Sequence, residues 1–362
     1  MVGPEQPLAL GLVDVFAKRG LRAFGPTRAA AELEASKVFA KTLFARYGIP
    51  TARFGTFEDP GRARAFVREL AGRVVVKADG LAAGKGAVVC ADAAEADRTI
   101  GDMLERRVFG AAGARVVVEE RLEGEELSFF ALTDGGAICP LGAAQDHKTV
   151  FDDDRGPNTG GMGAYSPPPV LDAALAERIM ETIIRPTVRA MAAEGRPYRG
   201  VLYAGLMLTR DGPIVLEYNA RFGDPECQVL VGRLASDLAP LCRAVADGAG
   251  LPSAAVWRPE AAVCVVLASG GYPGRYTTGH LISGLEAAEA RPGVTVFHAG
   301  TALREGRLVT DGGRVLGVTA VAEDLPAAIR AAYATVGDIR FEGMHCRRDI
   351  GRRALVRLGV SS

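Results

Sequence analysis

The sequence predicts a multidomain protein that combines α/β and α+β architecture. Strand and helix patterns alternate through the middle of the chain, which is typical of an α/β core. Two strand patterns flank a glycine-rich turn at 73–90 (RVVVKADGLAAGKGAVVC). After a linker at 248–257, strands near 294–300 and 314–322 and a helix at 326–336 predict a small α+β domain. A chain of 362 residues has room for two or three such domains.

The N-terminal residues predict an incomplete α/β unit. We interpret residues 1–5 as the end of a strand, 7–19 as an amphipathic helix with Leu8 and Val15 on one face, and 21–24 as a short strand. A parallel sheet needs more partner strands than these residues supply. We therefore expect 1–34 to be the remnant of an N-terminal α/β domain whose first part is missing.

The next helix is predicted from its two ends. Ser36 is expected to cap it and Gly48 to stop it, with Val38, Phe39, Thr42 and Leu43 facing inward. Further elements follow as strands at 51–57, 114–120, 201–208, 213–220 and 261–268 and as helices at 60–70, 93–109, 171–194 and 230–246. The Gly/Pro-rich stretch 156–169 is expected to form neither helix nor strand.

Composition excludes several classes of protein. Lys+Arg and Asp+Glu number 43 each, so the formal net charge is zero and a nucleic-acid partner bound through bulk charge is not expected. The six cysteines are scattered without a C-x-x-C pair, which indicates reduced thiols in a cytoplasmic protein. No apolar run has the roughly 20 residues of a membrane span, and no signal peptide is visible.

The glycine-rich turn at 73–90 suits a polyphosphate ligand. Gly80, Gly84 and Gly86 would let backbone N–H groups approach the ligand, while Lys77 and Lys85 add positive charge. The spacing differs from the P-loop pattern, and a strand follows the turn where a P-loop would open a helix. An ordinary hairpin with a solvated lysine is the alternative that the glycine spacing alone would favour.

The stretch 156–169 (GPNTGGMGAYSPPP) is a second candidate site. Long ordered loops are uncommon and tend to be functional. The alternative is a flexible linker, but Asn158, Thr159, Met162 and Tyr165 are not typical linker residues.

A third candidate site follows the strand at 213–220. Glu217 and Asn219 stand two residues apart, so both side chains leave the same face, as does that of Arg221. A carboxylate and an amide oxygen suit a hard cation such as Mg²⁺. Arg221 could stabilise negative charge on a reacting carbonyl or phosphoryl group. A solvated sheet edge is the alternative.

These segments together closely resemble the ATP-grasp ligases and, within them, the phosphoribosylamine–glycine ligase family. The resemblance covers nearly the whole chain and rests on VVVKADGLAAGKG (74–86), EERLEGEELS (119–128), QDHKTV (145–150), GPNTGGMGAYSP (156–167), LEYNARFGDPE (216–226) and HAGT (298–301). It implies an ATP-grasp fold at 35–247, with a flap subdomain at about 52–122, and a C-terminal α+β domain at 258–358. Members of the family begin with a strand and a glycine-rich loop, whereas Met1 here directly precedes VGPE.

The resemblance also implies roles for single residues. Lys37 and Lys77 would hold ATP phosphates, and a mobile flap with Gly80, Gly84, Lys85 and Gly86 would cover them. The segment with Glu119, Glu120 and Leu122 would recognise adenine, and Glu126 would bond the ribose. Glu217 and Asn219 would hold Mg²⁺ or Mn²⁺. Asp146, His147 and Arg221 would face glycine and its acyl phosphate. The pocket for the two substrates would be lined by Asn158, Thr159, Gly160, Gly161, Met162 and Asp224.

The implied reaction joins glycine to 5-phosphoribosylamine with ATP and gives glycinamide ribonucleotide, a step of purine biosynthesis. Two alternatives stay open, namely another ATP-grasp carboxylate–amine ligase and an inactive ATP-binding form that lacks the first N-terminal part. We expect a monomer that binds these small molecules and neither membrane nor nucleic acid.

His147 and the pair Arg347-Arg348 can also be interpreted as residues without a role in the site. His147 could be a buried core histidine, although its place in Gln-Asp-His-Lys favours a site role. Arg347 and Arg348 are predicted to lie on the surface.

Overall fold

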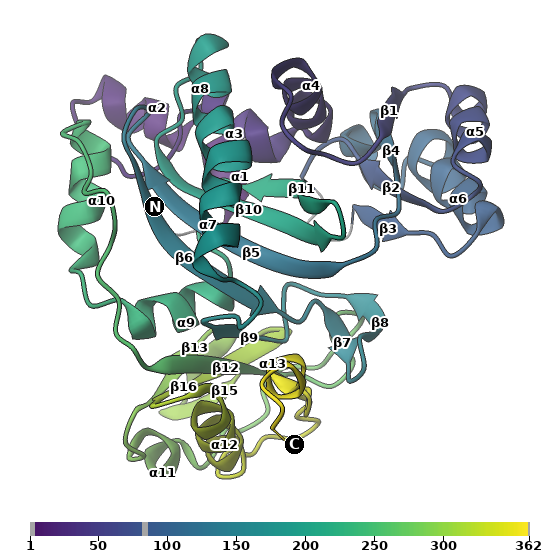
Figure 1. The fold of residues 1–362 in the computed structure, drawn as a ribbon. Helices are drawn as coiled ribbons and strands as arrows, with labels where there is room; N and C mark the ends of the chain where they lie inside the picture. The colour runs from purple at the N-terminus through teal and green to yellow at the C-terminus, as the bar shows by residue number, and fades with distance from the viewer. Residues whose placement is uncertain (1–3, 82–85, 361–362) are drawn as a thin grey trace. The chain divides into compact units, whose positions relative to one another are not determined.

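The computed structural model describes residues 4–81 and 86–360, and these form two compact units (Figure 1). Unit 1 comprises residues 1–141, 173–222 and 238–254, and unit 2 comprises residues 142–172, 223–237 and 255–362. No helix within the described ranges is both long and apolar enough to cross a membrane.

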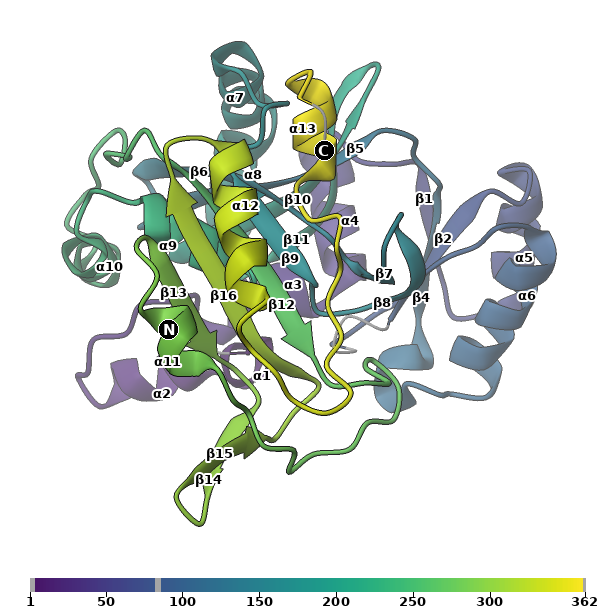
Figure 2. The ribbon, with the colours of Figure 1, turned by 90° about the horizontal axis from the view of Figure 1, so that it is seen from below.

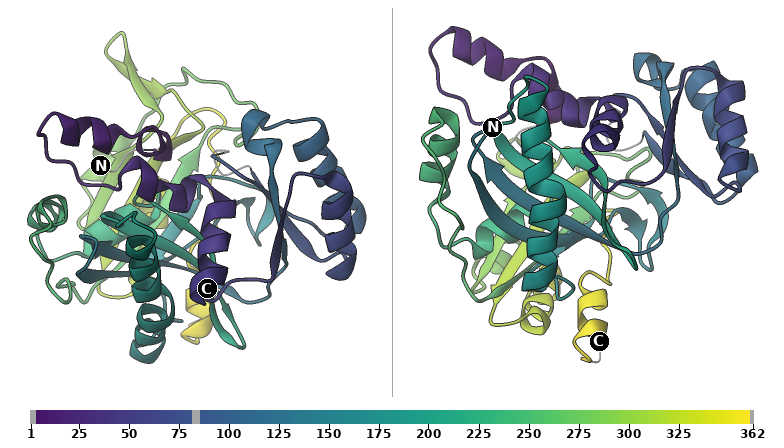
Figure 3. Two further views of the ribbon diagram at one scale, coloured as in Figure 1. Left: turned by 90° about the horizontal axis from the view of Figure 1, so that it is seen from above. Right: turned by 45° about the horizontal axis from the view of Figure 1, so that its top comes forward.

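Unit 1 begins with four helices, which Figure 3 shows in purple. They are α1 (Glu5–Ala9), α2 (Leu12–Lys18), α3 (Arg28–Ala35) and α4 (Lys37–Tyr47). The single helix predicted at 7–19 is wrong, because Gly11 has a φ of +88° and separates α1 from α2. Val15 is correspondingly 42% exposed instead of buried. The strand predicted at 21–24 is also absent, since these described residues have no regular structure.

The ends of α4 are as predicted, but its inward face is only partly so. Ser36 Oγ accepts the N–H of Phe39 at 3.1 Å, and Gly48 ends the helix with a φ of +67°. The buried side chains are Ala40, Lys41, Leu43 and Phe44, whereas Thr42 is exposed. Of the predicted inward residues, Leu43 is thus buried, Val38 and Phe39 are half-buried, and only Thr42 is wrong; the buried face also includes Lys41.

A small lobe follows, built on an antiparallel sheet in the order β1-β4-β2-β3. Its strands are β1 (Phe54–Phe57), β2 (Val74–Ala78), β3 (Ala87–Val89) and β4 (Val116–Glu120). The strands predicted on either side of the glycine-rich stretch are thus confirmed as β2 and β3, while residues 82–85 between them lie outside the described residues. Helices α5 (Pro60–Glu69) and α6 (Ala93–Ile100), drawn in blue in Figures 1 and 3, cover one face of the sheet. A π-helical turn, Gly101–Glu105, extends α6.

This lobe has a hydrophobic core of its own. Val74, Val76, Val116 and Val118 from the sheet are fully buried and pack in one cluster with Ala63, Val67, Ala96 and Ile100 from the two helices.

The rest of unit 1 contains long antiparallel strands in the order β11-β10-β5-β6. They are β5 (Glu125–Thr133), β6 (Ile138–Asp146), which runs on into unit 2, β10 (Gly200–Thr209) and β11 (Gly212–Asn219). The helix predicted at 171–194 is confirmed as α7 (Ala173–Ile179), a π-helical turn and α8 (Arg185–Ala193). The helix predicted at 230–246 is instead two helices, α9 (Glu226–Arg233) of unit 2 and α10 (Leu238–Asp247) of unit 1.

Unit 2 is an antiparallel sheet in the order β9-β12-β16-β13, with α12 (Leu325–Val336) packed along β12 and β16 (Figure 2). Its strands are β9 (Gly163–Ser166), β12 (Ala261–Ala268), β13 (Val294–His298) and β16 (Arg314–Ala322). Two hairpins and two short helices complete it: β7 (Thr149–Phe151) with β8 (Arg155–Asn158), β14 (Thr301–Arg304) with β15 (Arg307–Thr310), α11 (Leu285–Glu289) and α13 (Arg352–Arg357).

Two predictions for unit 2 are wrong. The stretch 156–169 includes the end of β8 and all of β9, because β9 pairs with both β6 and β12. Arg347 is 1% exposed and not on the surface: its guanidinium bonds both oxygens of Asp349 at 2.8 Å and contacts Asp154 at 3.0 Å. A buried arginine is stable here because neighbouring carboxylates compensate its charge.

Candidate active site

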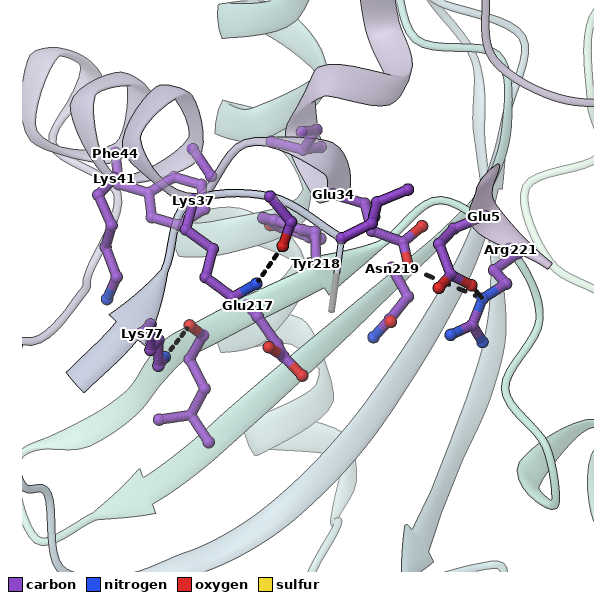
Figure 4. A pocket seen from close by; sticks show the side chains of 15 residues that line it. Glu5, Glu34, Lys37, Lys41, Phe44, Lys77, Glu217, Tyr218, Asn219 and Arg221 are labelled. Carbon is purple, nitrogen blue, oxygen red and sulfur yellow. Dashed lines mark hydrogen bonds and ion pairs between the residues drawn. The ribbon is translucent and has the colours of Figure 1, made fainter. Parts of the chain in front are cut away.

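A pocket of unit 1 brings residues of five elements together (Figure 4). The figure shows lysines on one side, Glu217 and Asn219 in the middle, and Arg221 with two glutamates on the other side. Its lining is Glu5, Leu33, Glu34, Lys37, Ala40, Lys41, Phe44, Lys77, Gly80, Leu81, Leu216, Glu217, Tyr218, Asn219 and Arg221.

Strand β11 supplies the middle of this pocket. Glu217 and Asn219 lie two residues apart on the strand, opposite Gly205 and Tyr203 of β10, and both are half-buried. Arg221 follows the end of the strand and lines the same pocket. The side chains that the alternating pattern assigns to one face thus all reach one cavity.

The glycine turn is fastened to the start of α4 by Asp79. Its Oδ1 accepts the hydroxyl of Ser36 at 2.9 Å and the N–H of Val38 at 3.1 Å. Lys37, the first residue of α4, donates to the carbonyl of Gly80 at 3.4 Å. The Ser36 cap and Asp79 therefore place the Lys37 ammonium at the mouth of the glycine turn.

Behind this turn, Lys41 and Lys77 share one carboxylate. Both lysines contact Glu119, Lys41 through Oε2 and Lys77 through Oε1, and all three side chains are at least nine-tenths buried. Sequence reasoning missed Lys41 because it assigned Thr42 to the inward face of α4. The available signal was helical spacing, since Lys41 stands one turn after Lys37.

The charges of this cluster are set by burial and by mutual attraction. Burial lowers the pKa of Lys41 to about 8, against the opposing effect of Glu119. Burial also acts to lower the pKa of Lys77, but the charges of Glu119 and Glu217 outweigh it, so that pKa lies above its usual range. For Glu119, burial is outweighed by the two lysines, which hold the pKa of the carboxyl below its usual range. At neutral pH the cluster carries two positive charges and one negative charge.

At the other side of the pocket, Arg221 lies between two glutamates that sequence reasoning also missed. Its Nε donates to Glu5 at 3.1 Å and lies 3.7 Å from Glu34. Glu34 also accepts the N–H of Ala220 at 2.8 Å, which fixes the end of β11 to α3. Burial raises the pKa of Glu34 to about 7, although Arg221 opposes the shift.

The donors present fit a divalent cation that is shared with phosphate. Among the residues that the structure describes, no group of three or more His, Cys, Asp or Glu is arranged to hold a metal ion. Glu217 and Asn219 offer one carboxylate and one amide oxygen. Mg²⁺ is commonly bound by one or two protein oxygens together with substrate phosphates and water, and this pair meets that need.

The residues expected to contact nucleotide are distributed around β4 and the glycine turn. The side chain of Glu119 is engaged by the two lysines, and Glu120 Oε1 accepts the N–H of Arg53 at 2.8 Å. Leu122 lies in the turn after β4, and Glu126 is half-buried on β5. Gly80 lines the pocket, and Gly86 accepts the N–H of Ala78 at 2.8 Å. Gly84 and Lys85 lie outside the described residues.

Asp146 and His147 belong to unit 2, at the end of β6. Asp146 accepts the Lys148 ammonium at 3.0 and 2.9 Å. His147 is 1% exposed, and burial together with the charges of Arg353 and Arg347 lowers its pKa to about 3. Its imidazole is therefore neutral across the physiological range, so His147 can donate or accept a hydrogen bond but supplies no positive charge.

The predicted substrate loop and Asp224 meet in unit 2 through Arg314. One guanidinium nitrogen donates to the carbonyl oxygens of Gly160 at 2.8 Å and Asp224 at 2.6 Å, and the other pairs with the Asp224 carboxylate at 2.9 Å. Thr159 Oγ1 accepts the N–H of Gly161 at 2.9 Å. Gly161 has a φ of +113° and lies so close to Pro225 that a Cβ would come within 2.5 Å, so the loop needs glycine there.

The other members of this loop differ in exposure. Met162 is fully buried, whereas Asn158 at the end of β8 is exposed. Arg314 was not singled out from the sequence, because an arginine opening a predicted strand carries no spacing signal.

The fold and this pocket define an ATP-grasp protein. A family model described as the ATP-grasp (A) domain of phosphoribosylglycinamide synthetase matches residues 35–227, and the models of the N and C domains match 1–34 and 262–353. The structure of a biotin carboxylase from Campylobacter jejuni has the same fold, with a TM-score of 0.72 at 18% identity over 92% of this chain and 72% of that one.

The chain belongs to the phosphoribosylglycinamide synthetase family. It is 53% identical to a phosphoribosylamine–glycine ligase of Vibrio vulnificus over 99% of this chain and 83% of the relative. The crystal structure of a phosphoribosylamine–glycine ligase from Thermotoga maritima superposes with a TM-score of 0.83 at 37% identity, covering 90% of this chain and 81% of that one.

Proposed function

We infer that this chain is an ATP-dependent ligase that joins glycine to 5-phosphoribosylamine. The products are glycinamide ribonucleotide, ADP and phosphate, in purine biosynthesis. The observation that carries this inference is the joint placement of Lys37, Lys77, Glu217, Asn219 and Arg221 in one pocket of a chain that is 53% identical to such a ligase.

The first step transfers the γ-phosphoryl group of ATP to glycine. An oxygen of the glycine carboxylate attacks the γ-phosphorus, the bond to the bridging oxygen breaks, and ADP leaves with the electron pair. Lys37 and Lys77 offset the phosphate charge, so that the attacking carboxylate meets less repulsion. Arg221 is held in a fixed direction by Glu5, and its planar fork of donors suits the carboxylate of glycine.

In the second step, the amine of phosphoribosylamine attacks the carbonyl carbon of glycyl phosphate. The carbon–oxygen bond to phosphate breaks, and the nitrogen loses a proton to give the amide, while the departing phosphate takes up that proton and leaves as hydrogen phosphate. No bond to the protein is formed, so the chain acts through positioning and electrostatic stabilisation.

A divalent metal ion would neutralise phosphate charge in the pocket, and we propose Mg²⁺, with Mn²⁺ as a possible substitute. Glu217 and Asn219 would hold it, and Arg221, which lines the same pocket, would face the reacting groups.

Further residues receive proposed roles from the family resemblance. Glu119–Leu122 and Glu126 would contact adenine and ribose, and Gly80 and Gly86 would lie beside the phosphates. Asp146, His147, Asp224 and the loop 158–162 would serve the two other substrates. The proposed domains are 1–34, 35–247 with a flap at about 52–122, and 258–358.

A coupled assay of ADP release tests this function. ADP is expected only when glycine and phosphoribosylamine are both present, and mass spectrometry should identify glycinamide ribonucleotide in the same reaction. Turnover with another carboxylic acid but not with glycine would refute the proposed substrate. Binding of ATP without any turnover would refute the ligase activity.

A further inference from the structure

Lys41 is a buried charged residue that the proposed chemistry does not use. It lies on α4, whereas its partner Glu119 lies on β4 and Lys77 on β2. Glu119 stands opposite Val75 in the antiparallel register, and Lys77 is two residues further along the same face. The two strand residues are therefore diagonal neighbours, a separation that a long side chain spans.

The ammonium of Lys41 is fixed independently of Lys77. It donates to Thr51 Oγ1 at 2.7 Å, and that hydroxyl donates to the carbonyl of Val215 at 3.1 Å. Lys77 in turn donates to the carbonyl of Leu216 at 3.1 Å. Each lysine thus has its own link to β11. Lys77 bonds the carbonyl of Leu216 directly, Lys41 reaches the carbonyl of Val215 through Thr51, and Glu119 lies between the two lysines.

This arrangement has a consequence for charge. Glu119 alone would neutralise Lys77 and leave this pair of side chains without net charge. Because Lys41 takes one of the two carboxylate oxygens, the three residues together retain one positive charge. Lys77 also keeps a single contact with Glu119, so its ammonium is directed toward the pocket that both lysines line.

We propose that Lys41 is a positioning residue for Lys77: by sharing Glu119, it prevents that carboxylate from neutralising the ammonium that binds polyphosphate. This inference rests on the proposed function, in which Lys77 contacts the phosphates of ATP. Lys41 itself acts through Glu119 and not as a phosphate ligand.

The substitution Lys41→Met tests this role without leaving a buried charge unpaired, because Glu119 keeps Lys77 as its partner. Removal of one positive charge near the phosphates is expected to raise the Kd for ATP about tenfold or more. The KM for ATP should rise in parallel, with a smaller change in kcat. The Kd for adenosine, which carries no phosphate, should stay within about twofold. Lys18→Met, the same change at an exposed lysine of unit 1, is the matched control.

The double variant Lys41→Met with Glu119→Gln separates positioning from direct contact. It has the same net charge as the wild-type cluster, one positive charge on Lys77. If Lys41 acts by offsetting Glu119, the ratio of the Kd for ATP to the Kd for adenosine in the double variant should return to within about threefold of its wild-type value, a ratio that cancels any effect of Glu119 on adenine binding. If Lys41 binds phosphate itself, the double variant should bind ATP no better than Lys41→Met, and the proposal would be refuted. Isothermal titration calorimetry with ATP, ADP and adenosine gives these constants directly.

A second replacement covers the case in which the glutamine variant does not fold. Lys41→Met with Glu119→Leu exchanges the pair for apolar side chains, a change that buried ion pairs often tolerate. The same recovery of ATP affinity is expected, and its absence in the folded protein would overturn the inference.

Failure of the wild type to bind ATP at all would instead refute the proposed function. Tight wild-type binding that is unchanged in Lys41→Met would refute only the role of Lys41.

Discussion

Replacing Glu34 with glutamine should stabilise the protein at neutral pH and above. Glu34 is a buried carboxyl that accepts the N–H of Ala220 at 2.8 Å and lies 3.7 Å from Arg221. Burial raises its pKa from an ordinary 4.5 to about 7. The glutamine side chain keeps an acceptor for Ala220 but carries no charge, so it resembles the protonated carboxyl.

The size of the effect follows from the two pKa values. Below pH 4.5 the carboxyl is protonated in both the folded and the unfolded chain. Between 4.5 and about 7 only the folded chain keeps the proton, so the free energy of unfolding falls as the pH rises through this window. Since one pKa unit corresponds to about 1.4 kcal/mol, the total loss is about 3 kcal/mol. Glu34→Gln lacks this loss.

Urea denaturation of both proteins at pH 5, 6, 7 and 8 measures the difference. The variant should gain relative to the wild type between pH 5 and 7, with an advantage of about 3 kcal/mol at pH 8. Glu32→Gln, at a half-exposed position on the same helix where the carboxylate pairs with Arg196, controls for the loss of a carboxylate outside the pocket. A stability difference between Glu34→Gln and the wild type that is constant from pH 5 to 8 would refute the reasoning.

Three further outcomes are expected. Glu217→Ala should abolish metal-dependent turnover with an unchanged far-UV circular dichroism spectrum, and undiminished turnover would contradict the proposed metal site. The imidazole resonances of His147 should not titrate between pH 5 and 8, because its pKa lies at about 3, and NMR titration with a His147→Gln assignment control would detect the opposite. Arg347→Met leaves the Asp349 carboxylate buried without its main partner, so urea denaturation should show a loss of about 3–5 kcal/mol. The same change at exposed Arg348 should cost no more than about 0.5 kcal/mol.

Local patterns predicted the elements that carry the pocket. The two-residue spacing of Glu217 and Asn219 on the strand predicted at 213–220 identified their common face on β11, and β-branched runs around glycines identified β2 and β3. The hydroxyl of Ser36 was a sufficient signal for the start of α4 and hence for the place of Lys37. These features depend on residues close in sequence, for which spacing is informative.

The partners that reach across the fold were not predictable in this way. Lys41 meets Glu119, 78 positions further along the chain, and Arg314 meets Gly160 and Asp224 from more distant segments. Arg347 looked like a surface residue because its partner Asp154 is recognisable only once the β7–β8 hairpin is folded against the C-terminal segment, and the neighbouring Asp349 does not by itself indicate burial. Long-range ionic pairs have no periodicity in one sequence, so tertiary contact alone reveals them.

The chain enters the small lobe at Arg53 and leaves it at Glu120, and these two residues lie side by side. Arg53 and Glu120 are joined there by two hydrogen bonds, from the Arg53 N–H to Glu120 Oε1 at 2.8 Å and from the Glu120 N–H to the Arg53 carbonyl at 2.9 Å. Because Lys77 and Glu119 both belong to the lobe sheet, a rotation of the lobe about this connection would keep their ion pair, but it would change the contact of Lys77 with the carbonyl of Leu216 on β11. Lys41 belongs to α4, outside the lobe, so the same rotation would lengthen or shorten its contact with Glu119. One carboxylate thus joins a lysine of the lobe to a lysine outside it.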